Sequence, residues 1–378
     1  MAPLHGLRVI DLTRVVAGPF CTMMLGDMGA EVLKIEEPQH GDDSRAWAPY
    51  IQGWGSFYLA LNRSKKSVAL DLKTKDGAEA LTRLVETADV LIENFRPGLM
   101  ARFGLDLAAL RAANPRLVTC SLTAFADDGG GPAPRPGYDI IMQALTGLMS
   151  ITGERDGEPT KVGVAVLDVI AGLYAAIGIQ AALAERERTG RGRHVDVALF
   201  DAGVAALVNQ AANHLLGGVV PGPMGSEHPN IVPYQVFHAS DRPFILAAGN
   251  DKLFRVTCEV LGRPELAEDL RFTTNDARVS NRSELLPLLV EAFVAAPASR
   301  WLAELGAAGV PCAPIRRLDE VFASPEGAAM VTTVDDAARG QLRLVADPIR
   351  FDGSRSAVRR PPPAVGEHTE EILRELDG

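Results

Sequence analysis

The sequence predicts an α/β fold with a Rossmann-like large domain and a small α/β domain. Short apolar strands alternate with helical segments along the first 200 residues, which is the pattern of βαβ units and a parallel sheet. The chain has 378 residues, more than one ordinary domain. A stretch dense in Gly and Pro, residues 217–233, then separates this part from a shorter second part.

The elements of the first part follow from hydrophobic periodicity and turn residues. Residues 7–12 form an apolar run, Gly18-Pro19 opens a helix to about Met28, and residues 31–35 give the next strand. Further strands are expected over 67–72, 90–93, 117–122 and 194–199, with helices over 75–87, 105–113, 169–184 and 201–216.

The second part alternates again on a smaller scale. Strands are expected over 234–238, 244–248 and 310–315, and helices over 252–261, 282–294 and 299–305. Beyond Pro325 the chain is expected to be mostly irregular, with a strand over 342–345 and a short helix after His368.

Composition excludes several classes of protein. With 47% hydrophobic residues, 23% charged residues and a net charge of −10, the chain is typical of a soluble globular protein and not of one that binds nucleic acid. The four cysteines lie far apart without a C-x-x-C pair, so neither a disulfide framework nor a metal site is expected. The charged residues among the first fourteen argue against a signal peptide, which predicts a cytoplasmic protein. Polar and small residues after Asp168 favour a buried helix over a membrane span.

The first turn, residues 16–20, has only one glycine of the dinucleotide fingerprint, so binding of NAD is not favoured. Asp168 is more informative, because it is the only charged residue between Val162 and Ala184. It is expected to cap the helix that follows, where backbone N–H groups and the helix dipole would keep it charged near neutral pH. On these residues alone capping is the favoured interpretation, because most caps do no chemistry. The second interpretation is a carboxylate nucleophile that attacks an activated acyl group, and both can hold at once.

Seven motifs in order resemble those of the family III CoA-transferases of the CaiB/BaiF type over essentially the whole chain. They are LHGLRVIDL at 4–12, AGP at 17–19, GAEVLKIE at 29–36, ENFRPG at 93–98, RPGYD at 135–139, GVAVLD at 163–168 and TGRG at 189–192.

The resemblance implies an interlocked homodimer, in which each chain has a Rossmann-like large domain and a small domain. The large domain would comprise residues 1–216, completed by residues 325–378 because the family's last segment returns to it. Residues 217–232 would then form a linker and residues 233–324 the small domain.

The resemblance also assigns the site. Asp168 matches the family's nucleophile, which forms acyl-aspartyl anhydride and aspartyl-CoA thioester intermediates. Coenzyme A would be a thioester substrate, with no tightly bound cofactor and no metal. The residues implied to bind it are Val15, Val16, Ala17, Leu70, Lys73, Asn94, Phe95, Arg102 and Phe103.

Tyr138 favours transfer over racemisation, because related α-methylacyl-CoA racemases use His as a base where this chain has Tyr. Candidates for binding the acceptor acid are Tyr138, Arg45, His228 and Gln235. Residues 227–234 resemble family members that act on dicarboxylates, so a succinyl-CoA-dependent dicarboxylate transferase is expected first, with oxalate, carnitine-like and aromatic acids as the other acceptors. A racemase-type enzyme and a non-catalytic CoA-binding protein remain the alternatives.

Overall fold

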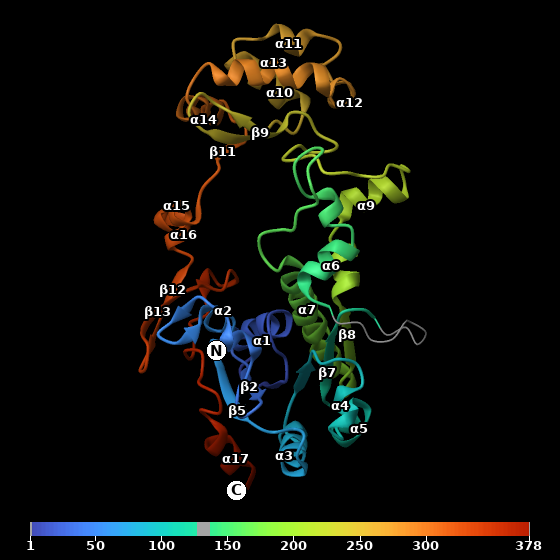
Figure 1. Cartoon of the computed structure of the whole chain (residues 1–378), viewed down its shortest axis with the longest axis vertical. Coiled ribbons are helices and arrows are strands. Elements are labelled where there is room, and N and C mark those ends of the chain that lie inside the picture. The colour runs from blue at the N-terminus through green and yellow to red at the C-terminus, as the bar shows by residue number, and fades with distance from the viewer. Residues whose placement is uncertain (1, 127–136, 378) are drawn as a thin grey trace. The chain divides into compact units, whose positions relative to one another are not determined.

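The computed structural model describes residues 2–126 and 137–377 (Figure 1). The chain divides into two compact units. The large unit consists of residues 1–148, 161–219 and 325–378, and the small unit of residues 149–160 and 220–324.

The large unit is built on a six-stranded sheet in the order β5-β2-β1-β6-β7-β8, and every pairing in it is parallel. This is the doubly wound order, whose switch point lies between β1 and β6. The predicted parallel α/β fold is therefore confirmed. The strands are β1 (Arg8–Asp11), β2 (Glu31–Glu36), β5 (Lys65–Ala69), β6 (Val90–Glu93), β7 (Val118–Thr123) and β8 (His194–Ala198).

Helices cover both faces of this sheet, because successive side chains of a strand point to opposite faces. Val9 joins a core cluster with α1 (Ala17–Asp27) and α7 (Val166–Thr189), which lie side by side in Figure 1. Ile10 joins a second cluster with α3 (Lys75–Glu86), α5 (Leu107–Ala113) and α17 (Thr369–Asp377). By length and composition alone α7 could span a membrane, but its buried residues pack against α1 and the sheet.

Two elements of the large unit differ from the sequence prediction for reasons that the structure shows. β5 starts two residues earlier than expected, because Lys65 and Lys66 are buried in ion pairs with Asp11 and Glu31. The helix expected over 201–216 is broken into α8 (Leu199–Ala205) and α9 (Val208–Leu215), and Val208 at the break has a φ of 41°. The remaining elements of this part are η1 (Asp43–Ala46), β3 (Tyr50–Ile51), β4 (Trp54–Gly55), α2 (Ser56–Leu61), α4 (Leu99–Arg102) and α6 (Asp139–Leu145).

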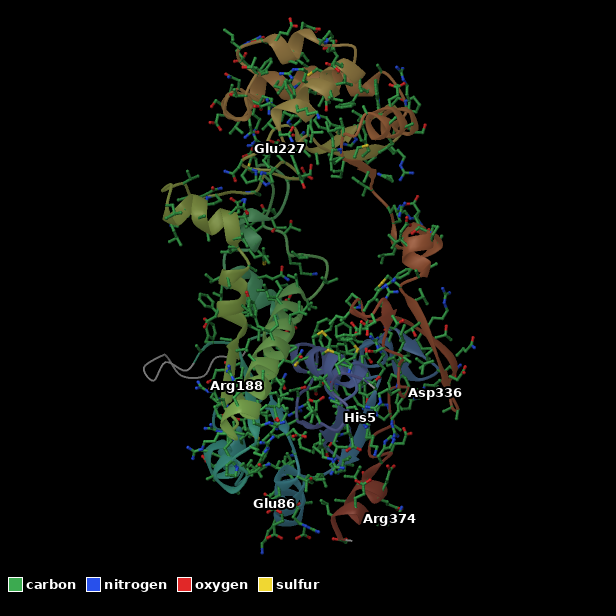
Figure 2. All side chains as sticks on the ribbon, turned by 180° about the vertical axis from the view of Figure 1, so that it is seen from behind. His5, Glu86, Arg188, Glu227, Asp336 and Arg374 are labelled. Carbon is green, nitrogen blue, oxygen red and sulfur yellow. The ribbon has the colours of Figure 1, made fainter. Side chains whose placement is uncertain are left out.

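The small unit has an antiparallel sheet in the order β11-β10-β9, with a core of phenylalanines and Trp301. It includes residues 149–160, which the sequence prediction places in the large domain. Gly225 N–H donates to the Gly153 carbonyl at 2.8 Å, and Glu227 (labelled in Figure 2) pairs with Arg155 at 2.9 Å. Its elements are η2 (Met149–Ile151), β9 (Tyr234–His238), β10 (Pro243–Ala247), α10 (Asp251–Val260), α11 (Glu265–Glu268), α12 (Asn275–Ser280), α13 (Arg282–Val294), α14 (Ala298–Ala307), β11 (Cys312–Pro314) and α15 (Leu318–Ala323).

The last segment returns to the large unit and lies along β5. The His368 N–H donates to the Ser67 carbonyl at 2.9 Å, and the Ser64 N–H donates to the Arg360 carbonyl at 3.0 Å. These bonds occupy the side of β5 that faces away from β2. The segment contains α16 (Pro325–Ala328), β12 (Val331–Asp336), β13 (Gly340–Val345), β14 (Arg350–Phe351), β15 (Ser354–Arg355) and α17, so it is more regular than expected.

Candidate active site

A cavity of about 760 Å³ opens at the carboxyl ends of β1, β6 and β7 in the large unit. This is the switch point of the sheet, where ligands of doubly wound folds bind. Its walls come from the loops after these strands, from α4 and from the first turn of α7. The lining residues are Arg14, Val15, Val16, Ala17, Asp43, Asn94, Phe95, Arg96, Pro97, Leu99, Arg102, Leu122, Thr123, Ala124, Gly137, Tyr138, Asp168 and Leu199.

Asp168 lies in the first turn of α7, two residues inside the helix, and is not its N-cap. Burial, followed by the nearby Asp139 carboxylate, raises its pKa to about 7. No donor in the described chain bonds to its carboxylate, so its oxygens are free to react. The expectation that a capping position keeps Asp168 fully charged near neutral pH is therefore wrong.

Asp139 does the capping instead. Its Oδ1 accepts hydrogen bonds from the N–H groups of Leu167 at 2.8 Å and Asp168 at 3.4 Å. Its Oδ2 accepts from Gln143 Nε2 at 2.5 Å, and Gln143 in turn accepts from the Val162 N–H at 2.9 Å. Asp139 therefore fixes the start of α7 and also brings a second carboxylate close to Asp168. It lies within the RPGYD motif, but no pattern in the sequence assigned it this role.

The loop after β1 carries an unusual backbone at Val15, whose φ is 74°. The left-handed region is strained for a β-branched residue. Asn94 braces the residue before it, because Oδ1 accepts from the Arg14 N–H at 3.0 Å and Nδ2 donates to the Arg14 carbonyl at 2.9 Å. Asn94, predicted to bind CoA, thus lines the cavity while both ends of its amide hold the loop.

Three guanidinium groups line the cavity: Arg14, Arg96 and Arg102. Arg14 lies over the Phe95 ring at 5.3 Å from its centroid and 3.8 Å from the Asp43 carboxylate. Arginine binds phosphate by bidentate hydrogen bonds, and apolar walls suit an adenine or an acyl chain. Arg14 and Arg96 were not predicted, although each follows the end of a strand at the switch point, which is a usable signal.

The predicted site residues fall into three groups. The cavity brings together Asp168, Tyr138, Val15, Val16, Ala17, Asn94, Phe95 and Arg102.

Four other predicted residues of the large unit lie outside its lining. Phe103 packs edge-on against Phe95, with ring centroids 5.9 Å apart, and Leu70 belongs to the core cluster below the sheet. Lys73 is exposed. Arg45 is engaged by Glu36 at 2.7 Å and stacks on Tyr58, with 11% of its side chain exposed.

The last two predicted residues belong to the small unit. The His228 ring is tilted against Tyr234, with centroids 5.2 Å apart, and Gln235 lies in β9. Burial and Arg282 lower the pKa of His228. Their role in binding the acceptor stays a prediction.

No group of three or more His, Cys, Asp or Glu side chains could hold a metal ion in the described ranges 2–126 and 137–377. The ionisable groups that line the cavity are the carboxylates of Asp43 and Asp168, the phenol of Tyr138 and three guanidinium groups. Such a set is suited to covalent acyl chemistry with an anionic substrate.

Comparisons with known proteins agree with this chemistry. The sequence pattern of the family described as "CoA-transferase family III" matches residues 4–369. A succinate–glutarate CoA-transferase of Agrobacterium fabrum is 43% identical, over 99% of this chain and 96% of its own. An acetyl-CoA:oxalate CoA-transferase of Acetobacter aceti is 40% identical, over 95% and 92%. The crystal structure of a CaiB/BaiF family protein from Brucella suis, 44% identical, superimposes with a TM-score of 0.86 and covers both chains completely.

Proposed function

Since the chain belongs to CoA-transferase family III, we propose that it moves CoA from succinyl-CoA to a dicarboxylic acid through covalent intermediates on Asp168. The observation that carries this proposal is Asp168 itself. It is a partly buried carboxylate without hydrogen-bond donors in the described chain, in a cavity that also offers three arginines and apolar walls.

In the first half of the reaction the Asp168 carboxylate attacks the thioester carbonyl of succinyl-CoA. The C–S bond breaks, which gives a succinyl-aspartyl anhydride and the CoA thiolate. The thiolate then attacks the aspartyl carbonyl, which releases succinate and leaves CoA on Asp168 as a thioester.

In the second half the acceptor carboxylate attacks the aspartyl-CoA thioester and again releases the thiolate. The resulting anhydride joins the acceptor to Asp168. The thiolate attacks the acceptor's carbonyl, so that acceptor-CoA leaves and the Asp168 carboxylate is restored. One thioester is consumed and another is formed, so the overall reaction is close to balanced in energy. Water must be kept from the anhydride, because hydrolysis would otherwise compete with transfer.

The charge of Asp139 favours the covalent intermediates of this reaction over the free Asp168 carboxylate. Its carboxylate raises the pKa of Asp168, which means that two negative charges near each other are unfavourable. Acylation of Asp168 removes one of these charges. The resting nucleophile is thereby destabilised relative to the neutral anhydride and thioester, while the bonds from Asp139 to the start of α7 hold it in place.

The binding of CoA rests on Arg14, Arg96 and Arg102, which would take its phosphates, and on Phe95 and the turn at Val15 to Ala17 as apolar wall. For the acceptor, the relatives named above act on glutarate and oxalate. We therefore place a dicarboxylate first, with Tyr138, the one predicted acceptor residue that lines the cavity, as a hydrogen-bond donor to it.

A homodimer is part of the proposal. None of the residues of α9 is buried, and Leu215 and Leu216 at its end are 79% and 88% exposed. An eight-residue helix with no packed face is not stable alone in water. Ile140 on α6 and Leu173 and Ile177 on α7 are also exposed, and a second copy of the chain would cover such apolar side chains. Light scattering at low protein concentration tests this, and a monomer would contradict it.

Product analysis by mass spectrometry tests the reaction. The purified protein is incubated with succinyl-CoA and, in turn, glutarate, oxalate and a monocarboxylic acid. Asp168→Ala serves as the inactive variant, and Asp201→Ala, an exposed aspartate in the first turn of α8, is the matched control. New acyl-CoA that the parent and Asp201→Ala form, but Asp168→Ala does not, supports the proposal. Solvent deuterium at the α-carbon without any acceptor would instead indicate a racemase.

A further inference from the structure

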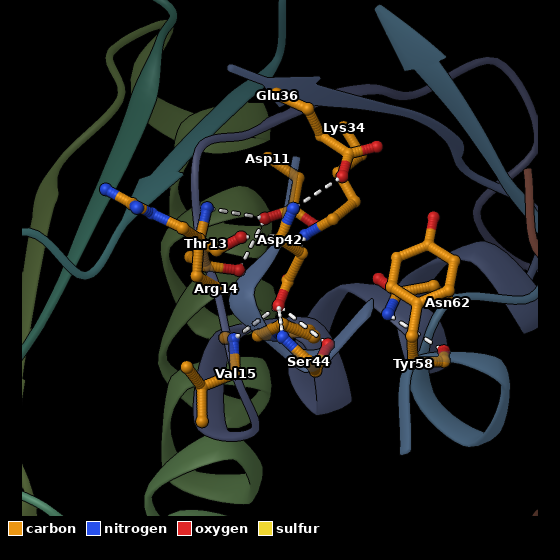
Figure 3. A network of polar contacts seen from close by, with 12 residues as sticks. Asp11, Thr13, Arg14, Val15, Lys34, Glu36, Asp42, Ser44, Tyr58 and Asn62 are labelled. Atoms are coloured by element: carbon orange, nitrogen blue, oxygen red, sulfur yellow. Dashed lines mark hydrogen bonds and ion pairs between the residues drawn. The ribbon is translucent and has the colours of Figure 1, made fainter. Parts of the chain in front are cut away.

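A buried polar network lies beneath the turn that carries Val15 (Figure 3). Val15 lines the cavity with a φ of 74°, a conformation that a β-branched residue adopts only when its surroundings impose it. The strain must therefore be balanced by contacts to the backbone of this turn.

Asp42 provides one of these contacts. It is 1% exposed, and its Oδ1 accepts a hydrogen bond from the Val15 N–H at 3.2 Å. The same oxygen accepts from the N–H and the hydroxyl of Ser44 at 2.9 and 2.7 Å, which fixes the carboxylate in place.

Lys34 joins Asp42 to the other side of the turn. Its side chain is fully buried, and Nζ donates to Asp42 Oδ2 and to the Thr13 carbonyl, both at 2.8 Å. The ammonium group of Lys34 thus connects the Thr13 carbonyl, before the turn, with the Asp42 carboxylate, which accepts the hydrogen bond from the Val15 N–H. The two side chains bracket residues 13–15 (Figure 3).

Burial alone would raise the pKa of Asp42, but Lys34 and Ser44 lower it to about 2, so the charged pair is favoured in the folded protein. A buried ion pair is often no more stabilising than an apolar pair of the same volume, because both charges lose their hydration. Burial of charged groups at this point is better explained by the geometry that they impose on the backbone.

Building on the proposed function, we propose that Asp42 and Lys34 are positioning residues for acyl-CoA. They hold Val15 in the left-handed conformation that presents the turn at Val15 to Ala17 to the cavity of Asp168. They do not touch the reacting atoms.

Asp42→Asn tests this, because it keeps the size of the side chain but removes the charge that binds Lys34. We expect the Kd of free CoA, measured by titration calorimetry, to rise about tenfold, as for the loss of one hydrogen bond to a charged group. The KM of succinyl-CoA should rise by the same factor, whereas the KM of the acceptor acid should not change. Ser44→Ala loosens the same carboxylate without removing its charge and should raise the Kd about threefold.

Asp27→Asn is the matched control. Asp27 forms an equally buried ion pair with Arg63 at 2.8 Å, and neither residue lines the cavity. It should leave the Kd of CoA unchanged.

The Val15→Asn background identifies the mechanism, because Asn adopts the left-handed region more readily than Val. In this background Asp42→Asn should raise the Kd of CoA by less than threefold. An undiminished tenfold effect would mean that Asp42 does not act through the conformation of Val15.

Unchanged CoA affinity in both Asp42→Asn and Ser44→Ala would overturn the proposal. If the parent binds CoA but transfers none to any acid, the proposed function fails. The calorimetric comparison would still decide whether Asp42 positions the turn.

Discussion

Replacing Asp168 by Asn should abolish transfer and, at the same time, stabilise the protein, by an amount that depends on pH. The reason is the cost of the ionised carboxylate in the folded state. Burial and Asp139 raise the pKa of Asp168 from 3.8 to about 7, whereas in the unfolded chain it has its ordinary value. Asn has the same size and no charge, so it removes this cost.

The magnitude follows from proton linkage. Between pH 4 and pH 7 the folded protein binds more protons at Asp168 than the unfolded chain does, so this group makes the fold less stable as pH rises. With about 1.4 kcal/mol for each pKa unit, Asp168→Asn should raise the free energy of unfolding by about 2 kcal/mol at pH 5 and about 4 kcal/mol at pH 8.

Guanidinium unfolding of the parent and the variant at pH 5, 6.5 and 8 measures this difference. Asp201→Asn corrects for the loss of a negative charge in the first turn of a helix, because Asp201 occupies that position in α8 and is exposed. If Asp168→Asn raises the free energy of unfolding equally at pH 5 and pH 8, or lowers it at pH 8, the pKa of Asp168 is not raised. Its ionised carboxylate then does not destabilise the folded protein.

Three further predictions concern the reaction. The rate at which succinyl-CoA acylates Asp168 should fall about tenfold from pH 8 to pH 6, because only the ionised carboxylate attacks. Exchange of labelled succinate into succinyl-CoA measures this rate, and a flat pH profile would contradict the prediction. Asp139→Asn removes the second charge but keeps an oxygen for the start of α7, so the midpoint of that profile should move to lower pH and the ratio of the rates at pH 6 and pH 8 should rise about twofold. An unmoved midpoint would show that burial alone sets the pKa. Arg102→Gln should raise the KM of succinyl-CoA about tenfold and leave that of the acceptor unchanged, and an equal rise in both would argue against a phosphate contact.

Patterns of apolar residues were enough to predict the parallel sheet, because the strands at Val9, Val32 and Val90 are buried on both faces. The charged residues that form part of the same core were not predictable in this way. Lys65 interrupts the apolar pattern of β5, yet it is fully buried because Asp11, far away in sequence, pairs with it at 3.1 Å. Pairing of this kind depends on the tertiary fold.

The site was predictable to a similar extent. The isolation of Asp168 in an uncharged stretch singled out this carboxylate, and the resemblance to the family predicted that it is the nucleophile. The loops after β1 and β6 were expected at the CoA site. Its pKa was not predictable, because it depends on burial and on Asp139, which lies 29 residues earlier. For Arg45 the sequence prediction is not supported by the structure. Its charge suggested that it binds the acceptor acid, but its guanidinium already pairs with Glu36 and bonds to the Tyr58 hydroxyl.

The return of the last segment to β5 has a consequence for synthesis on the ribosome. Residues 325–378 emerge last, and until then the outer edge of β5 lacks the bonds from Arg360, His368 and Thr369. An open strand edge is a template for pairing with other chains. Nascent or prematurely terminated chains should therefore be prone to aggregate, although the six strands of the sheet are complete at Ala198. The C-terminal segment therefore protects the edge of a sheet whose strands are all synthesised long before it.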